Sequence, residues 1–176
     1  GWAQQGRSHD VAVFKMKSTF EAHLGLAFHQ NSNRTNNIFD GANAYKSMQF
    51  LWLNKKLDKA AISILALNNG VAFNGTNGQE TVYSQTVGTH IKYKAGDKLN
   101  FAFNAYYQGG DVVYKDAITP LSAYNILAEA NYKPGKINWT LGYEWLSGND
   151  VTDNTTLQSF TPLYGTNHKF NGFMDY

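Results

Sequence analysis

The chain has 176 residues, a mass of 19.7 kDa and a net charge of +2, and this small charge, with no basic run, argues against nucleic acid as a partner. It contains no cysteine, which excludes disulfide bonds, thiolate metal sites and a cysteine nucleophile. No run of about 18 apolar residues is present, so the sequence predicts no transmembrane helix.

Apolar and polar residues alternate along most of the chain, which is typical of β-strands with two different faces. Several alternating runs last 10–13 residues. Soluble strands usually have about 5–6 residues, whereas a tilted strand needs about 9–11 to cross a membrane. No segment of useful length has helical spacing with caps. In chain order, the predicted strands cover 10–17, 19–30, 45–54, 59–67, 81–93, 99–108, 124–132 and 137–145.

The predicted connections alternate between short and long, which indicates a series of hairpins in a single domain over 1–176. The short turns lie at 17–18, 54–58, 94–98 and 133–136. The long polar loops lie at 31–43, 69–80, 109–120 and 147–168. The hairpins cover 10–30, 45–67, 81–108 and 121–146, and a loop with a C-terminal motif covers 147–176.

One face of the clearest strands is apolar along its whole length. In the four clearest strands, no position on this face carries a charge or an amide. Aromatic residues lie near its ends, as expected for rings at a lipid–water interface. The predicted lipid-facing girdle consists of Phe20, Phe28, Tyr124, Tyr132, Trp139, Tyr143 and Trp145.

These features predict an all-β fold, an antiparallel transmembrane β-barrel of the outer-membrane type. Backbone groups in lipid must be paired within the protein, so a sheet that crosses a membrane has to close. The alternative is a soluble β-sandwich or lipocalin-like barrel, in which the apolar face would form the core. Alternation by itself does not separate these two folds.

The opposite, polar face is expected to line a water-filled lumen. Three Lys and three Glu stand among amides and imidazoles, without Arg, so the wall is mixed in charge. The predicted lumen-lining residues are Lys15, Lys17, Glu21, His23, His29, Gln49, His90, Lys92, Asn100, Asn104, Gln108, Asn125, Glu129, Asn131, Asn138 and Glu144.

The C-terminal stretch "SFTPLYGTNHKFNGFMDY" (159–176) resembles a segment of the alginate-export family of outer-membrane porin-like proteins of Bacteroidota. In that family a P-L-Y-G-T-N-H-K-F stretch leads into M-D-Y-F. The upstream "RSHDVAVFKMK" and "FEAHLGLAFHQN" also look like the family's hairpin pattern. The resemblance implies a larger barrel, of about 16–18 strands, and transport of polyanionic sugars or other small solutes by diffusion.

Only eight strands are readable before residue 148, no signal-peptide pattern opens the chain, and the family motif continues to Tyr176. We therefore expect a fragment of a longer chain. The alternative is a complete eight-stranded barrel that ends in the aromatic Tyr176.

The predicted function is that of an outer-membrane porin-like channel for passive passage of small solutes or sugars, with no catalytic residue, cofactor or metal. The mixed wall favours general small-solute or neutral-sugar passage over selectivity for alginate, whose polyanion would call for a basic lumen. The expected partners are outer-membrane lipids and a small solute or oligosaccharide. Two alternatives stay open: an accessory or structural barrel subunit of a larger outer-membrane complex, with partner proteins, or a small eight-stranded outer-membrane enzyme.

The loop 147–168 is expected to fold inward and narrow the pore. It is long, rich in Asn, Thr and Gly, and ends in a dense group of aromatic and polar residues beside a Pro-Leu-Tyr-Gly turn. The predicted constriction residues are Phe160, Tyr164, Asn167, His168 and Lys169.

Overall fold

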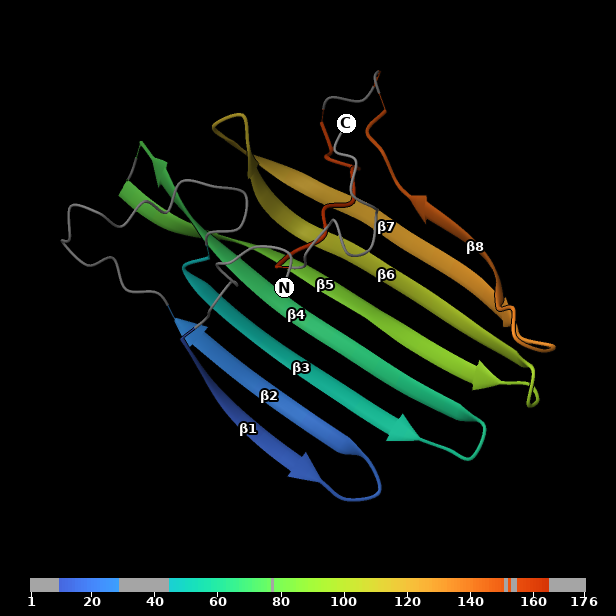
Figure 1. Ribbon diagram of the computed structural model, residues 1–176. Helices are drawn as coiled ribbons and strands as arrows, with labels where there is room; N and C mark the ends of the chain where they lie inside the picture. The colour runs from blue at the N-terminus through green and yellow to red at the C-terminus, as the bar shows by residue number, and fades with distance from the viewer. Residues whose placement is uncertain (1–9, 29–44, 77, 151, 153–154, 165–176) are drawn as a thin grey trace.

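The computed structural model describes residues 10–28, 45–76, 78–150, 152 and 155–164. Eight strands form one antiparallel sheet in which each strand pairs with its neighbour in sequence (Figure 1). Across the described residues, β1 and β8 do not pair with each other, so the sheet is open. No helix in this part of the chain is long and apolar enough to cross a membrane. The strands are β1 (Val11–Lys17), β2 (Glu21–Phe28), β3 (Ser47–Lys56), β4 (Ala60–Gly75), β5 (Gly78–Lys94), β6 (Leu99–Tyr114), β7 (Ala117–Tyr132) and β8 (Trp139–Leu146).

Four short connections lie at one end of the sheet, which we call the turn end, and the opposite end is the loop end. The turn end joins β1 to β2, β3 to β4, β5 to β6 and β7 to β8. The predicted short turns at 17–18, 54–58, 94–98 and 133–136 all lie there. The sheet therefore has the hairpin order that the sequence predicts.

The expectation of long loops at 69–80 and 109–120 was wrong, because both segments continue the sheet. β4 and β5 stay paired out to Gly75 and Gly78, and β6 and β7 out to Tyr114 and Ala117. These strands have 16 or 17 residues, more than the about 9–11 that a membrane crossing needs. The Asn and Gly residues in these segments are weak strand formers, which hid the extended ribbons in the sequence.

The β6–β7 ribbon closes with a two-residue turn at Lys115 and Asp116. Their φ angles are 49° and 58°, the positive values that a type I′ hairpin requires at both central residues. Asn-Gly is the usual signal for such a turn, and Lys-Asp does not carry it, so sequence reasoning placed a loop here.

The register assigns every strand residue to one of two faces, because residues directly opposite in neighbouring strands share a face. Leu24, Leu51, Ala66, Val87 and Tyr107 follow one another across β2 to β6 and belong to what we call the apolar face. The row Glu21, Asn54, Ser63, His90 and Asn104 crosses the same strands on the other side, which we call the polar face.

Large apolar side chains are exposed on the apolar face and are not packed into a core. Leu141 is 79% exposed and Tyr143 is 72% exposed. Among the described residues, the buried apolar ones are few: Ala27, Met48, Val82, Leu121 and Ala123. An apolar surface of this extent is unusual for a soluble monomer and fits contact with lipid. The predicted girdle residues Phe28, Tyr124, Tyr132, Trp139, Tyr143 and Trp145 lie on this face, and Phe20 lies in the β1–β2 turn.

Candidate functional site

The polar face brings together most of the residues predicted to line a lumen. Their register positions put them on one side of the sheet, in six different strands. Asn138 lies just before β8, and His29 lies outside the described residues. The predicted residues that share the polar face are Lys15, Lys17, Glu21, His23, His90, Lys92, Asn100, Asn104, Gln108, Asn125, Glu129, Asn131 and Glu144.

The placement of Gln49 on the polar face was wrong. Gln49 stands opposite Leu26 of β2 and Asn68 of β4, which puts it on the apolar face. There its Oε1 accepts a hydrogen bond of 2.7 Å from Asn68 Nδ2, and Asn68 Oδ1 accepts one of 2.8 Å from Gln85. This row of paired amides lies toward the loop end of the sheet. Apolar residues on the same face of β3, such as Leu51, lie closer to the turn end.

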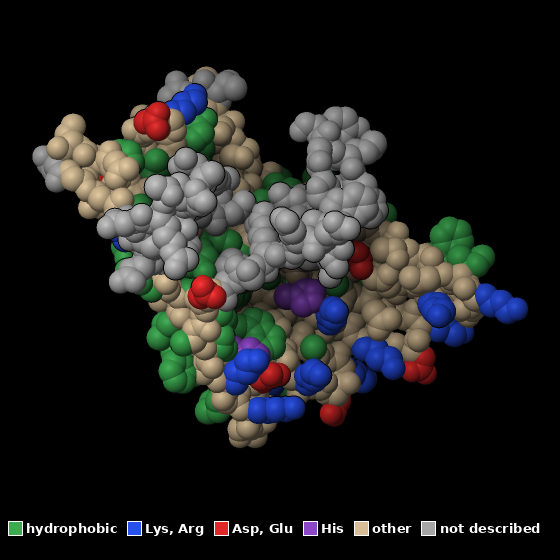
Figure 2. All heavy atoms as spheres, turned by 60° about the vertical axis from the view of Figure 1, so that its left-hand side comes forward, with side chains coloured by type: hydrophobic (Ala, Val, Ile, Leu, Met, Phe, Trp, Pro, Cys, Tyr) green, Lys and Arg blue, Asp and Glu red, His purple; other side chains and the backbone are tan. Residues whose placement is uncertain are grey.

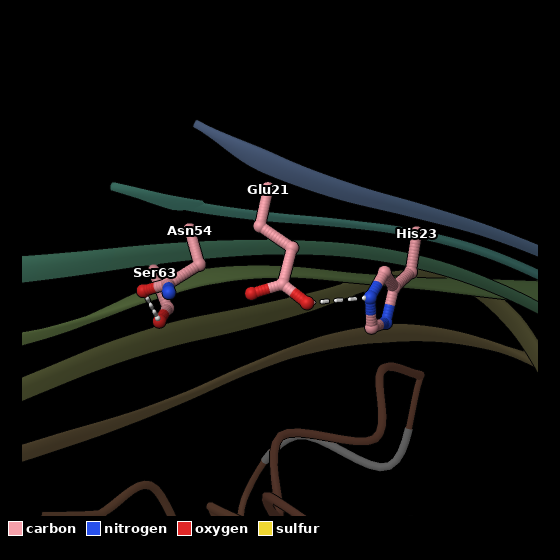
Figure 3. Close-up of polar contacts among 4 residues, drawn as sticks. All are labelled: Glu21, His23, Asn54 and Ser63. Atoms are coloured by element: carbon pink, nitrogen blue, oxygen red, sulfur yellow. Dashed lines mark hydrogen bonds and ion pairs between the residues drawn. The ribbon is translucent and has the colours of Figure 1, made fainter. Parts of the chain in front are cut away.

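Short-range hydrogen bonds hold the polar side chains near the turn end in place. His23 pairs with Glu21 at 3.0 Å, and Ser63 Oγ donates to Asn54 Oδ1 at 3.1 Å. Figure 3 shows these four side chains on one side of the sheet, the side toward the trace of residues after β8. His90 Nδ1 also pairs with Asn104 Oδ1 on the neighbouring strand.

Lysine side chains gather at the turn end of the polar face. Lys56 and Lys94 join the predicted Lys15, Lys17 and Lys92, because they share the parity of Lys92 in the register. All five are exposed, and Figure 2 shows the blue side chains along one edge of the molecule with few red ones. Lys55, Lys59, Lys98, Lys133 and Lys136 lie in or beside the same turns. Lys56 and Lys94 lie just beyond the predicted strands 45–54 and 81–93, so the prediction did not include them.

Residues 155–164, which we call the crossing segment, run from the free edge of β7 across the loop half of the polar face (Figure 1). Leu157 forms a parallel bridge with Leu121: its N–H donates to the Pro120 carbonyl at 2.8 Å, and its carbonyl accepts from Ser122 at 2.9 Å. Further along, the Gln108 amide bonds both backbone groups of Thr161, at 2.8 Å and 3.1 Å. Gln108 is only 3% exposed, so this is a buried junction.

Two of the five predicted constriction residues lie in the crossing segment. The Tyr164 hydroxyl donates a hydrogen bond to Asn69 Oδ1 of β4, and its ring meets Tyr45 edge to face with centroids 5.6 Å apart. Burial, with a smaller effect from the Asp10 carboxylate, raises the pKa of the Tyr45 hydroxyl. The Phe160 N–H donates to the Ser147 carbonyl at 3.0 Å. Asn167, His168 and Lys169 lie outside the described residues.

The middle of the polar face carries three aromatic residues that were not among the predicted site residues: Phe50, Trp52 and Tyr106. The predicted place of Gln49 on the polar face implied that Phe50 and Trp52 are lipid-facing, because residues one and three positions away lie on the opposite face of a strand. The register instead pairs them with Gly25 and His23 of the polar face. A Cβ added to Gly88 would lie 2.1 Å from Tyr106 Cδ1, and one added to Gly25 would lie 2.1 Å from Phe50 Cε1. Each of these two rings therefore lies over a glycine of the adjacent strand. A glycine directly across from an aromatic residue was the signal that could have revealed this arrangement.

A family model described as "Alginate export" matches residues 27–176, which is most of the chain. The chain belongs to the alginate export family. Neither the comparison with curated proteins nor the comparison with solved structures found a match.

Membership in the alginate export family confirms the predicted fold class, because this family consists of outer-membrane β-barrel proteins. The alginate export family is a family of transport channels, so membership places the chain among transport proteins. In the described part of the chain, no three His, Asp or Glu side chains form a group that could hold a metal ion. The assignment to Bacteroidota and the fragment of a larger barrel stay predictions.

Proposed function

We propose that this alginate-export chain forms part of the wall of an outer-membrane pore through which small solutes or sugars pass by diffusion. The observation that carries the proposal is the division of the sheet into an exposed apolar face and a face of amides, imidazoles, hydroxyls and lysines. When the apolar face meets lipid, the polar face is turned to the barrel interior. There its groups can replace part of the hydration shell of a passing solute.

The five lysines of the polar face give the turn end of the pore a positive potential. Of the nearby acidic residues, Asp97 pairs with Lys94 at 3.6 Å, and Glu21, which stands opposite Lys17, pairs with His23. Acidic residues are therefore fewer here than lysines. Fixed charges at a narrow entrance raise the local concentration of ions of opposite sign. The pore is therefore expected to prefer anionic over cationic solutes at this entrance.

The crossing segment is the proposed constriction. Its Leu157 is fixed to the free edge of β7, and its later residues cover the polar face through contacts with Gln108 of β6 and Asn69 of β4. A backbone segment fixed at three points narrows the space in front of the sheet without depending on one contact.

The test is the conductance of the full-length protein in planar lipid bilayers, with a deletion of 152–164 as the main variant. We expect the wild-type protein to conduct ions and the deletion to conduct more per channel. The control is Lys115→Asn combined with Asp116→Gly, which keeps a type I′ turn at another loop tip and should leave conductance unchanged. A wild-type protein and a deletion that both fail to conduct would refute the pore.

A second candidate function, an accessory barrel subunit with a closed lumen, is supported by the depth of burial under the crossing segment. Gln108 is 3% exposed and Asn69 is 5% exposed, so little water reaches the wall there. In that case the wild-type protein would not conduct ions, and the variant with residues 152–164 deleted would conduct. The same recordings therefore separate an open pore from a closed barrel.

A further inference from the structure

We propose that the polar face carries a binding subsite for a neutral pyranose ring, formed by Trp52, Tyr106, Ser63, His90 and Asn104. The subsite presupposes the pore proposed above, because its residues face solutes only if the polar face lines the lumen. It adds a defined position, a ligand class and a set of contacts to that function.

The site is a cavity of about 380 Å³ between the lysines of the turn end and the crossing segment. This volume lies within the range of about 300–1,000 Å³ that is usual for small-molecule pockets. Trp52, Leu65, Gly88 and Tyr106 follow one another across β3 to β6, and the row Ser63, His90 and Asn104 lies next to them toward the turn end. The cavity thus has an aromatic side and a polar side.

The two rings of the aromatic side are held in place by their neighbours. The Tyr106 ring covers Gly88, where any side chain would collide with it. The Trp52 ring packs against the His23 ring, with centroids 4.9 Å apart. Rings fixed against the wall lose little conformational freedom when a ligand stacks on them. The C–H face of a pyranose is the part of a sugar that packs against an aromatic ring.

The polar side retains hydrogen-bonding capacity toward a ligand. Asn104 uses its Oδ1 toward His90 Nδ1, which leaves the Asn104 amide nitrogen as a donor and His90 Nε2 as an acceptor. Ser63 Oγ donates to Asn54 and can still accept. Donors and acceptors along one edge of an aromatic platform match the ring of hydroxyls around a pyranose.

The charge of the cavity sets the class of sugar. Its lining residues are Trp52, Ser63, Ile64, Leu65, His90, Asn104 and Tyr106, none of which carries a permanent charge. Lys92 lies two residues beyond His90, toward the turn end. An acidic sugar would gain from the lysines, whereas a neutral sugar gains most from the aromatic side. We therefore assign the subsite to a neutral ring.

The test measures binding of maltotriose, a neutral probe, and of trigalacturonic acid, an acidic one, to the full-length protein in detergent micelles by calorimetry. Trp52→Ala and Tyr106→Ala should each weaken maltotriose binding by about 5–10-fold, the size of one lost aromatic contact. Asn104→Leu, which keeps the volume and removes the amide, should also weaken it. Phe50→Ala is the matched control, because Phe50 lies over Gly25 on the same face but does not line the cavity.

Folding of each variant is checked by the shift in gel mobility between unboiled and boiled samples. Absence of maltotriose binding to the wild-type protein, or equal binding by the wild type and Trp52→Ala, overturns the subsite. Trigalacturonic acid that binds more tightly than maltotriose, and is indifferent to Trp52→Ala, also overturns it, because the lysines would then be the binding site. Conductance of the same preparations is recorded in parallel, so a pore without the subsite is distinguished from failure of the pore itself.

Discussion

The loop half and the turn half of the polar face share one sheet but differ in how their polar groups are satisfied. In the loop half, Asn69, Ser84, Thr86 and Gln108 are buried, and two of them bond the crossing segment. In the turn half, the lysines are exposed and the other polar side chains bond one another. Buried polar groups need protein partners, whereas exposed ones can use water. The loop half therefore holds the crossing segment in place, and the turn half stays accessible to solutes.

The largest expected effect comes from breaking the junction between Gln108 and Thr161. Gln108→Ala leaves both backbone groups of Thr161 without their partner, and an unsatisfied group costs about 1–3 kcal/mol. We expect the crossing segment to leave the loop half, with faster proteolysis within 155–164 and higher conductance.

Asn131→Ala is the control for this change, because Asn131 forms hydrogen bonds with the side chains of Glu129 and Thr140 in the exposed turn half. Equal protease resistance of Gln108→Ala and the wild type would mean that the bridge at Leu157 holds the segment by itself.

The next effect in size is a loss of stability, expected when a side chain is added under an aromatic ring of the turn half. A Cβ at Gly88 would lie 2.1 Å from the Tyr106 ring and 2.5 Å from the Ala105 carbonyl oxygen. Overpacking of this kind costs about 1–3 kcal/mol, so Gly88→Ala should unfold at a lower temperature in the heat-dependent gel-mobility assay.

Gly142→Ala provides the comparison, since a Cβ there would lie 3.6 Å from the nearest atom, Glu129 Cγ, an ordinary contact. If the two variants unfold at the same temperature, Tyr106 moves away at little cost and the ring is not fixed by Gly88.

Charge reversal in the turn half should change selectivity without changing the fold. Lys15→Glu combined with Lys92→Glu replaces two exposed positive charges of the proposed entrance. We expect the anion-to-cation permeability ratio, obtained from reversal potentials, to fall a few-fold at low salt and to recover as salt screens the charges. Lys46→Glu, near the loop end, should change the ratio less.

The smallest effect is expected for the exposed ion pair between Lys94 and Asp97, whose atoms lie 3.6 Å apart. Exposed pairs contribute little because water and salt screen them. Asp97→Asn should leave the unfolding temperature unchanged and slightly raise anion preference in the conductance assay. A clear loss of stability would show that the turn end depends on this pair.

Strand direction and face could be predicted wherever the two faces differ in composition. In 19–30 and 99–108 the apolar positions repeat every second residue, and the structure keeps that parity. In 45–54 both parities contain large apolar residues, and the prediction chose the wrong one, which moved Gln49 to the polar face and hid Phe50 and Trp52. Local alternation cannot choose between two faces that are similarly apolar.

The sequence by itself determined the strands, the two kinds of surface, the family motif and the expectation that the segment after the last strand folds inward. These properties depend on residue type and on a period of two, both of which are local. The tertiary structure decided the register, and with it the lengths of the β4–β5 and β6–β7 ribbons, the rings over glycines and the contacts of Gln108 and Asn69 with the crossing segment. Each of these joins residues far apart in the chain, and only the pairing of whole strands determines which distant residues meet.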